Sequence, residues 1–179
     1  MKATGIVRRI DDLGRVVIPK ELRRTMRLRE GAPLEIFTDK DGELIFKKYS
    51  PIGELTDFAA DLCDALRKAS EATAAVCDRD SVIAAAGAAK KEVLGKPLGA
   101  ALEGILDKRA LYRHEGAETL PLGEEAGRHS VGVAAPILCE GDVVGGVLFF
   151  EPGGAKSCGE TELRLAQAAA HFLGRQMEG

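Results

Sequence analysis

Basic side chains crowd into the first thirty positions of this 179-residue chain, between short apolar segments. Arginine is planar, always charged and able to hold a phosphate through two parallel hydrogen bonds, so clustered arginines suit polyanion binding. Most runs of charge are instead solvated surface, and composition alone leaves both interpretations open. The residues concerned are Arg8, Arg9, Arg15, Lys20, Arg23, Arg24, Arg27 and Arg29.

The charge of the chain is unevenly distributed. The formal net charge is −3, but residues 1–50 contain 12 Lys+Arg and 8 Asp+Glu, whereas residues 51–179 contain 13 and 20. A basic N-terminal part (+4) joined to an acidic C-terminal part (−7) indicates two parts with different partners. Polyanion binding is expected to belong to the first part.

Short elements must position these bases. β-Branched residues predict strands at 6–10 and 15–18, joined by a polar turn at 11–14. Pro19 suits the first position of a short helix, which Gly31 is expected to end.

A second pair of strands follows, at 34–37 and 44–46, joined by the hairpin turn Asp39-Lys40-Asp41-Gly42. Fifty residues in four short strands bury too little apolar surface to be stable alone. With no disulfide or metal site in view, size by itself predicts that this part dimerises.

The segment GRVVIPKELRR, within a stretch running from Met1 to Tyr49, resembles the AbrB family of bacterial transition-state regulators. The resemblance covers about the first fifty residues. It implies that two chains interleave their hairpins into one swapped-hairpin β-barrel whose arginines contact double-stranded DNA. By position, Arg8, Arg15, Arg23 and Arg24 match the family's DNA-contacting arginines, and Lys2, Arg9 and Lys20 are implied as supporting contacts.

A stretch that contains proline and glycine, around residue 50, separates the two parts. We therefore predict a DNA-binding domain at 1–50, a linker or helix start at 51–55 and a second, GAF-like domain at 56–179. Helical spacing predicts an amphipathic helix over 54–70. Its expected apolar face consists of Leu55, Phe58, Leu62, Leu66 and Ala69.

Beyond this helix, strands are predicted at 74–79 and 81–86, then a helical or irregular stretch at 88–108. A run of strands from 119 to 150 includes a hairpin turn at Glu140-Gly141-Asp142.

Ser157 and Glu160 have the spacing of a capping box and predict the start of a final helix. That helix is apolar on two sides, so we expect it to pack on its own sheet and on a partner helix. One side holds Leu163, Ala166, Ala170, Leu173 and Met177, and the other holds Leu165, Ala169 and Phe172.

This order of elements is similar to that of a GAF domain. Together, the two resemblances imply an α+β chain with a barrel-forming AbrB-like head and a GAF-like α/β tail. A head and tail of these kinds resemble a sporulation regulator of the AbrB family, activating some genes and repressing others. The tail lacks the Asn-Lys…Phe…Asp-Glu pattern of cyclic-nucleotide GAF domains and has no phosphate-binding loop. Sensing of an unknown small molecule and assembly into a tetramer therefore both stay open.

Two other functions are compatible with parts of the sequence. An antitoxin of the AbrB/MazE type would also bind DNA, but its tail would be disordered when free. A GAF-fold thiol enzyme would use Cys77 and Cys139, whereas the simpler expectation is that the cysteines are buried hydrophobes. We expect no catalytic residue, metal or cofactor. We also expect a location in the cytoplasm at the nucleoid, because no signal peptide or membrane-spanning run is visible.

Overall fold

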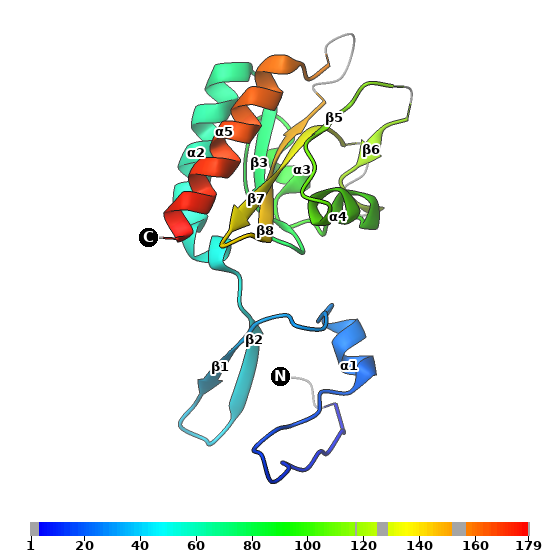
Figure 1. Cartoon of the computed structure of the whole chain (residues 1–179), viewed down its shortest axis with the longest axis vertical. Helices are drawn as coiled ribbons and strands as arrows, with labels where there is room; N and C mark the ends of the chain where they lie inside the picture. Colours follow the sequence, from blue (N-terminus) through cyan, green and yellow to red (C-terminus); the bar gives the residue numbers. More distant parts are fainter. Residues whose placement is uncertain (1–3, 117, 125–128, 152–156, 179) are drawn as a thin grey trace. The chain divides into compact units, whose positions relative to one another are not determined.

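A computed structural model describes residues 4–116, 118–124, 129–151 and 157–178 (Figure 1). The chain divides into two compact units, residues 1–49 and residues 50–179. Both contain helices and antiparallel strands, so the predicted α+β class is confirmed.

In the first unit, the predicted hairpin is confirmed. Strand β1 (Leu34–Thr38) pairs antiparallel with β2 (Leu44–Lys48), with Ile36 opposite Phe46. The Asp39 carboxylate closes the turn by accepting the backbone N–H groups of Asp41 (3.0 Å) and Glu43 (2.9 Å). Gly42 adopts φ 79°, a left-handed conformation that glycine tolerates without steric cost.

The strands predicted at residues 6–10 and 15–18 do not form within a single chain. Both segments flank a turn in which the Gly14 N–H donates to the Asp11 carbonyl (3.0 Å), as predicted for 11–14. A strand requires a neighbour to accept and donate its backbone hydrogen bonds. Among the described residues no such neighbour lies beside these segments, so the prediction of strands was wrong for one chain taken alone.

Helix α1 (Lys20–Thr25) begins directly after Pro19. It is shorter than predicted and ends at Thr25, well before Gly31. The chain turns out of the helix at Arg27, whose φ of 51° is left-handed. Backbone bonds from the Leu28 N–H to the Arg23 carbonyl (2.7 Å) and from the Arg27 N–H to the Arg24 carbonyl (3.2 Å) complete a Schellman motif.

The described residues of the first unit form no hydrophobic core in one chain. Pro19 is the only buried residue among residues 4–49, and α1 contains none. Large apolar side chains are exposed instead, with Val7 at 84% and Val17 at 72%. Because exposed apolar area of this extent is unfavourable in water, this unit alone cannot account for its own stability.

The second unit is built on one six-stranded antiparallel sheet of order β4-β3-β8-β7-β5, with β6 also paired to β7 (Figure 1). The strands predicted near 74–86 and the hairpin turn at 140–142 are confirmed. The two-residue strand β5 was missed because it is too short to show alternation. The strands are β3 (Thr73–Cys77), β4 (Val82–Ala86), β5 (Tyr112–Arg113), β6 (Leu120–Pro121), β7 (Ser130–Cys139) and β8 (Asp142–Phe150).

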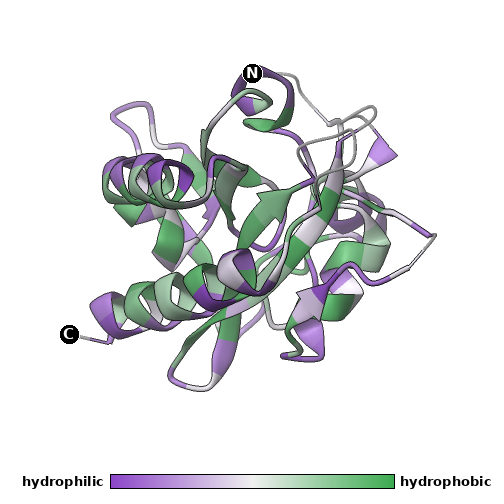
Figure 2. Cartoon of the chain, turned by 90° about the horizontal axis from the view of Figure 1, so that it is seen from above, coloured by the Kyte–Doolittle hydropathy of each residue, from purple (hydrophilic) through white to green (hydrophobic). Residues whose placement is uncertain are grey.

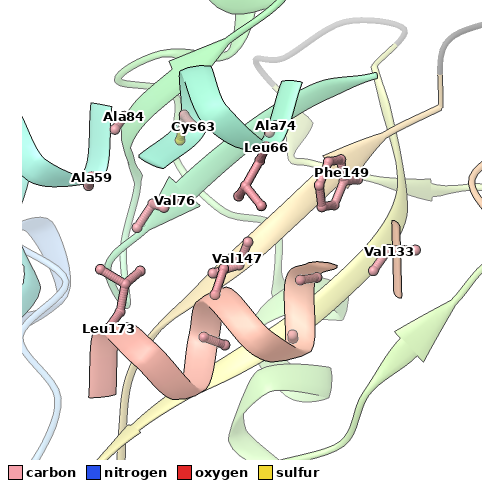
Figure 3. Packing of buried hydrophobic residues seen from close by; sticks show 14 of the residues in the cluster. Ala59, Cys63, Leu66, Ala74, Val76, Ala84, Val133, Val147, Phe149 and Leu173 are labelled. Atoms are coloured by element: carbon pink, nitrogen blue, oxygen red, sulfur yellow. The ribbon is translucent and has the colours of Figure 1, made fainter. Parts of the chain in front are cut away.

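Helices cover both faces of this sheet and create two apolar clusters. The cluster beneath α2 and α5 includes Leu66, Phe149 and Leu173 (Figure 3), and the other lies beneath α3 and α4. Seen from above, the helices carry both hydrophobic and hydrophilic positions around their turns (Figure 2). The helices are η1 (Pro51–Leu55), a 3-10 helix, then α2 (Thr56–Ser70), α3 (Lys90–Val93), α4 (Ala100–Asp107) and α5 (Glu160–Met177).

The stretch predicted as a linker or helix start is ordered as η1, and its Ile52 is fully buried in the second unit. Helix α2 forms as predicted, and most of its predicted apolar face is confirmed. Leu66 is buried, and Leu55 and Leu62 are partly buried against the same cluster. Phe58 and Ala69 are exposed instead, and Ala59 and Cys63 are buried.

Helix α5 is confirmed, but its predicted cap at Ser157 is wrong. Gly159 is the N-cap residue, and its N–H donates to the Glu162 carboxylate (2.7 Å). Small residues on the inner side allow α5 to approach β7 so closely that a Cβ atom added at Gly174 would overlap the Leu138 carbonyl oxygen. The residues of α5 that are buried are Ala166, Ala169, Ala170, Leu173 and Gly174.

Candidate nucleic-acid interface

The predicted DNA-contacting residues are distributed over two extended segments and one helix. Arg8 and Arg9 precede the turn at 11–14, and Arg15 follows it directly. Lys20, Arg23 and Arg24 lie on α1, where residues three and four apart share a face. Lys2 lies outside the described residues.

Most of these bases are exposed and have no acidic partner. Within the described parts of the chain, no carboxylate forms an ion pair with Arg8, Arg9, Lys20, Arg23 or Arg24. A phosphate that approached them would not have to displace an existing ion pair. The arrangement is therefore suited to binding a polyanion through charge-assisted hydrogen bonds.

Arg15 differs because it is held by its own turn. Its Nε donates to the Asp11 carboxylate (2.9 Å), and its backbone N–H donates to the other oxygen of the same group (2.7 Å). These bonds, led by the Arg15 backbone N–H, hold the pKa of Asp11 below its usual value. The turn thus orients the guanidinium while the side chain stays largely exposed to solvent.

Arg23 has a polar atom without a partner. Its side chain is half-buried, and the Nε is buried without a hydrogen bond among the described residues. A buried donor left unsatisfied costs about 1–3 kcal/mol.

Replacing Arg27 with glycine is expected to stabilise the N-terminal unit by about 1 kcal/mol, because glycine adopts the left-handed position of a Schellman motif without steric conflict. Urea unfolding of the full chain followed by circular dichroism measures the change. Met26→Gly is the matched control, since Met26 has an ordinary φ of −89° and its replacement should destabilise. Equal effects of the two variants would contradict this account of Arg27.

The tail offers no activated thiol at the positions suggested for an enzyme. Cys77 lies opposite Gly146 on one side of β8, and Cys139 lies opposite Asp142 on the other side, so a strand separates them. Burial raises the pKa of the Cys77 thiol, and that of Cys139 is also raised, by burial and by nearby carboxylates. Burial raises the pKa of both Cys63 and Cys158 to about 12. Such thiols stay protonated and are poor nucleophiles at neutral pH.

Both units match known protein families. Residues 54–178 match the family described as "Stage V sporulation protein T C-terminal, transcription factor". Residues 7–54 match "Antidote-toxin recognition MazE, bacterial antitoxin".

Two curated relatives come from Bacillus subtilis (strain 168). The chain is 50% identical to stage V sporulation protein T over 182 residues, which cover 99% of both proteins. It is 54% identical to the transition state regulatory protein AbrB over 63 residues, covering 32% of this chain and 65% of that protein. The second match confirms the AbrB resemblance of the N-terminal part.

Solved structures confirm the fold of the tail. The GAF domain of a phosphoenolpyruvate-protein phosphotransferase from Coxiella burnetii superposes with a TM-score of 0.54 at 15% identity, over 69% of this chain and 82% of that one. A free methionine-R-sulfoxide reductase from Thermoplasma acidophilum superposes with a TM-score of 0.52 at 12% identity, over 69% and 94%. At such identities these structures show the fold alone. The GAF-like tail, the AbrB-like head and the full-length match together show that the chain belongs to the stage V sporulation protein T family of transcription factors.

Proposed function

We propose that the chain acts as a homo-oligomeric DNA-binding regulator that activates some sporulation genes and represses others. The observation that carries this proposal is a set of bases, Arg8, Arg9, Lys20 and Arg24, that are exposed and form no ion pair within the described parts of the chain, on a unit whose apolar side chains are also exposed. The first feature suits DNA and the second suits a second copy of the same unit. We place the protein in the cytoplasm, at the nucleoid. Among the described residues, no helix is long and apolar enough to cross a membrane.

Two N-terminal units would complete each other's core. The segments around Val7 and Val17 are rich in the β-branched residues typical of strands but, among the described residues, have no strand partner within one chain. Pairing with the same segments of a second chain would supply the missing hydrogen bonds and bury the apolar side chains. The resulting barrel would carry two copies of every base in the predicted interface.

Phosphate contacts would supply much of the affinity for DNA, because each neutralised phosphate releases condensed counterions. The predicted contacts contain only arginine and lysine, so direct reading of bases would be limited to guanine. Selectivity would then depend partly on the shape and deformability of the duplex. The acidic tail, with a net charge of −7, would be repelled by DNA and would favour approach through the head.

The double variant Arg23→Ala/Arg24→Ala tests the interface. Fluorescence anisotropy on a labelled AT-rich duplex, over a series of salt concentrations, is expected to show weaker binding. The slope of log K against log salt should become shallower by about 1 for each phosphate that the variant no longer neutralises. The matched control is Arg67→Ala/Lys68→Ala, which removes the same charge from the last turn of α2.

Binding is expected to stay close to wild type in this control. Equal losses of affinity in both double variants would show a general effect of charge and contradict the assignment of the interface. Failure of the wild-type chain to bind any duplex at low salt would overturn the regulator function itself.

The tail carries a surface suited to further assembly. The rings of Phe58 on α2 and Phe172 on α5 lie 5.7 Å apart between centroids, yet these side chains are 39% and 45% exposed. Exposed aromatic pairs of this kind are typical of interface cores. We propose that this pair meets its copy on another tail, which would join two barrels into a tetramer and add avidity without any new kind of interaction with DNA.

The double variant Phe58→Ala/Phe172→Ala is expected to convert tetramers into dimers, because the anchor of the tail interface is removed while the barrel is untouched. Sedimentation velocity measures the mass. Leu94→Ala, at an exposed apolar residue after α3, is the control and should stay tetrameric. A tetramer that persists in the double variant would place the tail interface elsewhere.

The two alternative functions find less support. The match of residues 7–54 to an antitoxin family agrees with a shared DNA-binding head. An antitoxin tail would be disordered when free, whereas this tail has two apolar clusters around a six-stranded sheet. A thiol enzyme is disfavoured because Cys77 and Cys139 are separated by β8, and we propose that the protein has no enzymatic activity.

A further inference from the structure

A cationic pocket lies at the edge of the sheet in the second unit, between α5, the end of β7 and the loop after α4. Its volume is about 540 Å³, within the range typical of small-molecule sites. Its polar lining consists of Arg109, Arg164, Gln167 and His171.

The charge of this lining is opposite to that of the domain around it. The tail has a net charge of −7, yet none of the described residues that line the pocket carries a carboxylate. Two carboxylates lie next to it. Glu160 accepts from the Nε of Arg164 (2.7 Å), and Asp142 is 4.0 Å from Arg109. Glu160 occupies only one nitrogen of the Arg164 guanidinium, and the distance from Asp142 to Arg109 is too long for a hydrogen bond. Both guanidinium groups therefore keep nitrogen atoms that can bind an anion.

The rest of the pocket is apolar. Leu111, Pro136 and Leu138 contribute the larger apolar side chains, and Ala135, Ala168 and Ala170 complete the lining. Guanidinium groups beside an apolar wall suit a ligand with one anionic group and an apolar body, because charge and apolar surface are satisfied together.

The strand edge at this place is poorly suited to a peptide. Strand β5 pairs with β7 only at Val133 and Ala134, so the edge beyond Ala134 has no strand beside it among the described residues. Strand addition requires backbone donors and acceptors along that edge. Pro136 has no N–H, and the Leu138 carbonyl is covered closely by Gly174. A compact ligand fits these features better than an added strand.

We propose that this pocket binds a small organic anion, with a carboxylate or phosphate group at Arg109 and Arg164 and an apolar body against Pro136 and Leu138. Gln167 and His171 would contribute hydrogen bonds to the anionic group. The site would make the tail a sensor in addition to its part in assembly.

Saturation-transfer NMR on the full-length chain tests the site with three aromatic probes, namely benzoate, phenyl phosphate and the neutral isostere benzamide. At least one anionic probe is expected to bind at least about tenfold more tightly than benzamide, which corresponds to one charge interaction of about 1.4 kcal/mol. Preference for benzoate would identify carboxylates as the ligand class, and preference for phenyl phosphate would identify phosphates. The readout contains no DNA, so its failure is independent of the DNA-binding proposal.

Variants locate the binding. Arg109→Gln/Arg164→Gln should weaken anionic binding at least about tenfold, and Arg175→Gln, on the same helix but outside the pocket lining, should leave it unchanged. Gln167→Glu should also weaken anionic binding, because it adds a carboxylate to the pocket, and it removes no existing ion pair. This single variant therefore tests the site even if the double variant fails to fold. Absence of anionic binding, equal binding of benzamide, or full binding by the Gln167→Glu variant would overturn the proposal.

Discussion

Replacing Val17 with aspartate is expected to abolish DNA binding while the tail stays folded. Val17 is 72% exposed in one chain, at the centre of the apolar segment Val16-Val17-Ile18. If two heads form one barrel, this segment becomes buried, and an unpaired carboxylate there would cost several kcal/mol. Because the described residues of the head form no core of their own, loss of the barrel removes the ordered interface as well.

Anisotropy on the duplex measures the loss of DNA binding, and thermal unfolding by circular dichroism reports whether the tail still melts cooperatively. Val17→Ile is the control, since it keeps the apolar character and the β-branched shape, and it should bind DNA as wild type does. If the aspartate variant bound DNA normally, Val17 would face solvent in the assembled protein. The proposed pairing of heads through this segment would then be wrong.

Replacing Gly174 with alanine is expected to destabilise the tail by about 3 kcal/mol. A Cβ atom at this position would overlap the Leu138 carbonyl oxygen, where α5 packs on β7. The obstacle is backbone on both sides, so the helix would have to move away from the sheet. This cost exceeds the gain of about 1 kcal/mol that alanine normally brings to a helix. Urea unfolding of the full chain measures the difference.

Gly104→Ala is the matched control for this experiment. Gly104 also lies within a helix, α4, but apart from the helix's own backbone no atom of the described residues is within 4 Å of the position its Cβ would take. The same substitution should therefore stabilise the protein, by about 0.5–1 kcal/mol. Opposite signs at the two glycines would show that close packing on β7, and not helix propensity, governs position 174. A stabilising effect at both would contradict the close approach of α5 to β7.

Elements whose signals are local can be recognised from the amino-acid sequence alone. Alternation and turn chemistry identify the β1–β2 hairpin and the turn at 140–142, and helical spacing identifies α2 and α5. The basic residues of the head are likewise visible in composition and in the segment GRVVIPKELRR. These features depend on neighbours along the chain, so they can be recognised without coordinates.

Features that depend on contacts between distant residues become visible in the folded chain. The strands predicted at 6–10 and 15–18 have no neighbour among the described residues of one chain, although their local pattern is that of strands. On α2, Leu66 is buried as its spacing predicts, but Phe58 is exposed and Cys63 is buried in the contact with the sheet. The cationic pocket joins Arg109 to Arg164 across fifty-five positions of sequence. Pairing, packing and pocket formation depend on which segments meet in space, and periodicity along one segment does not contain that information.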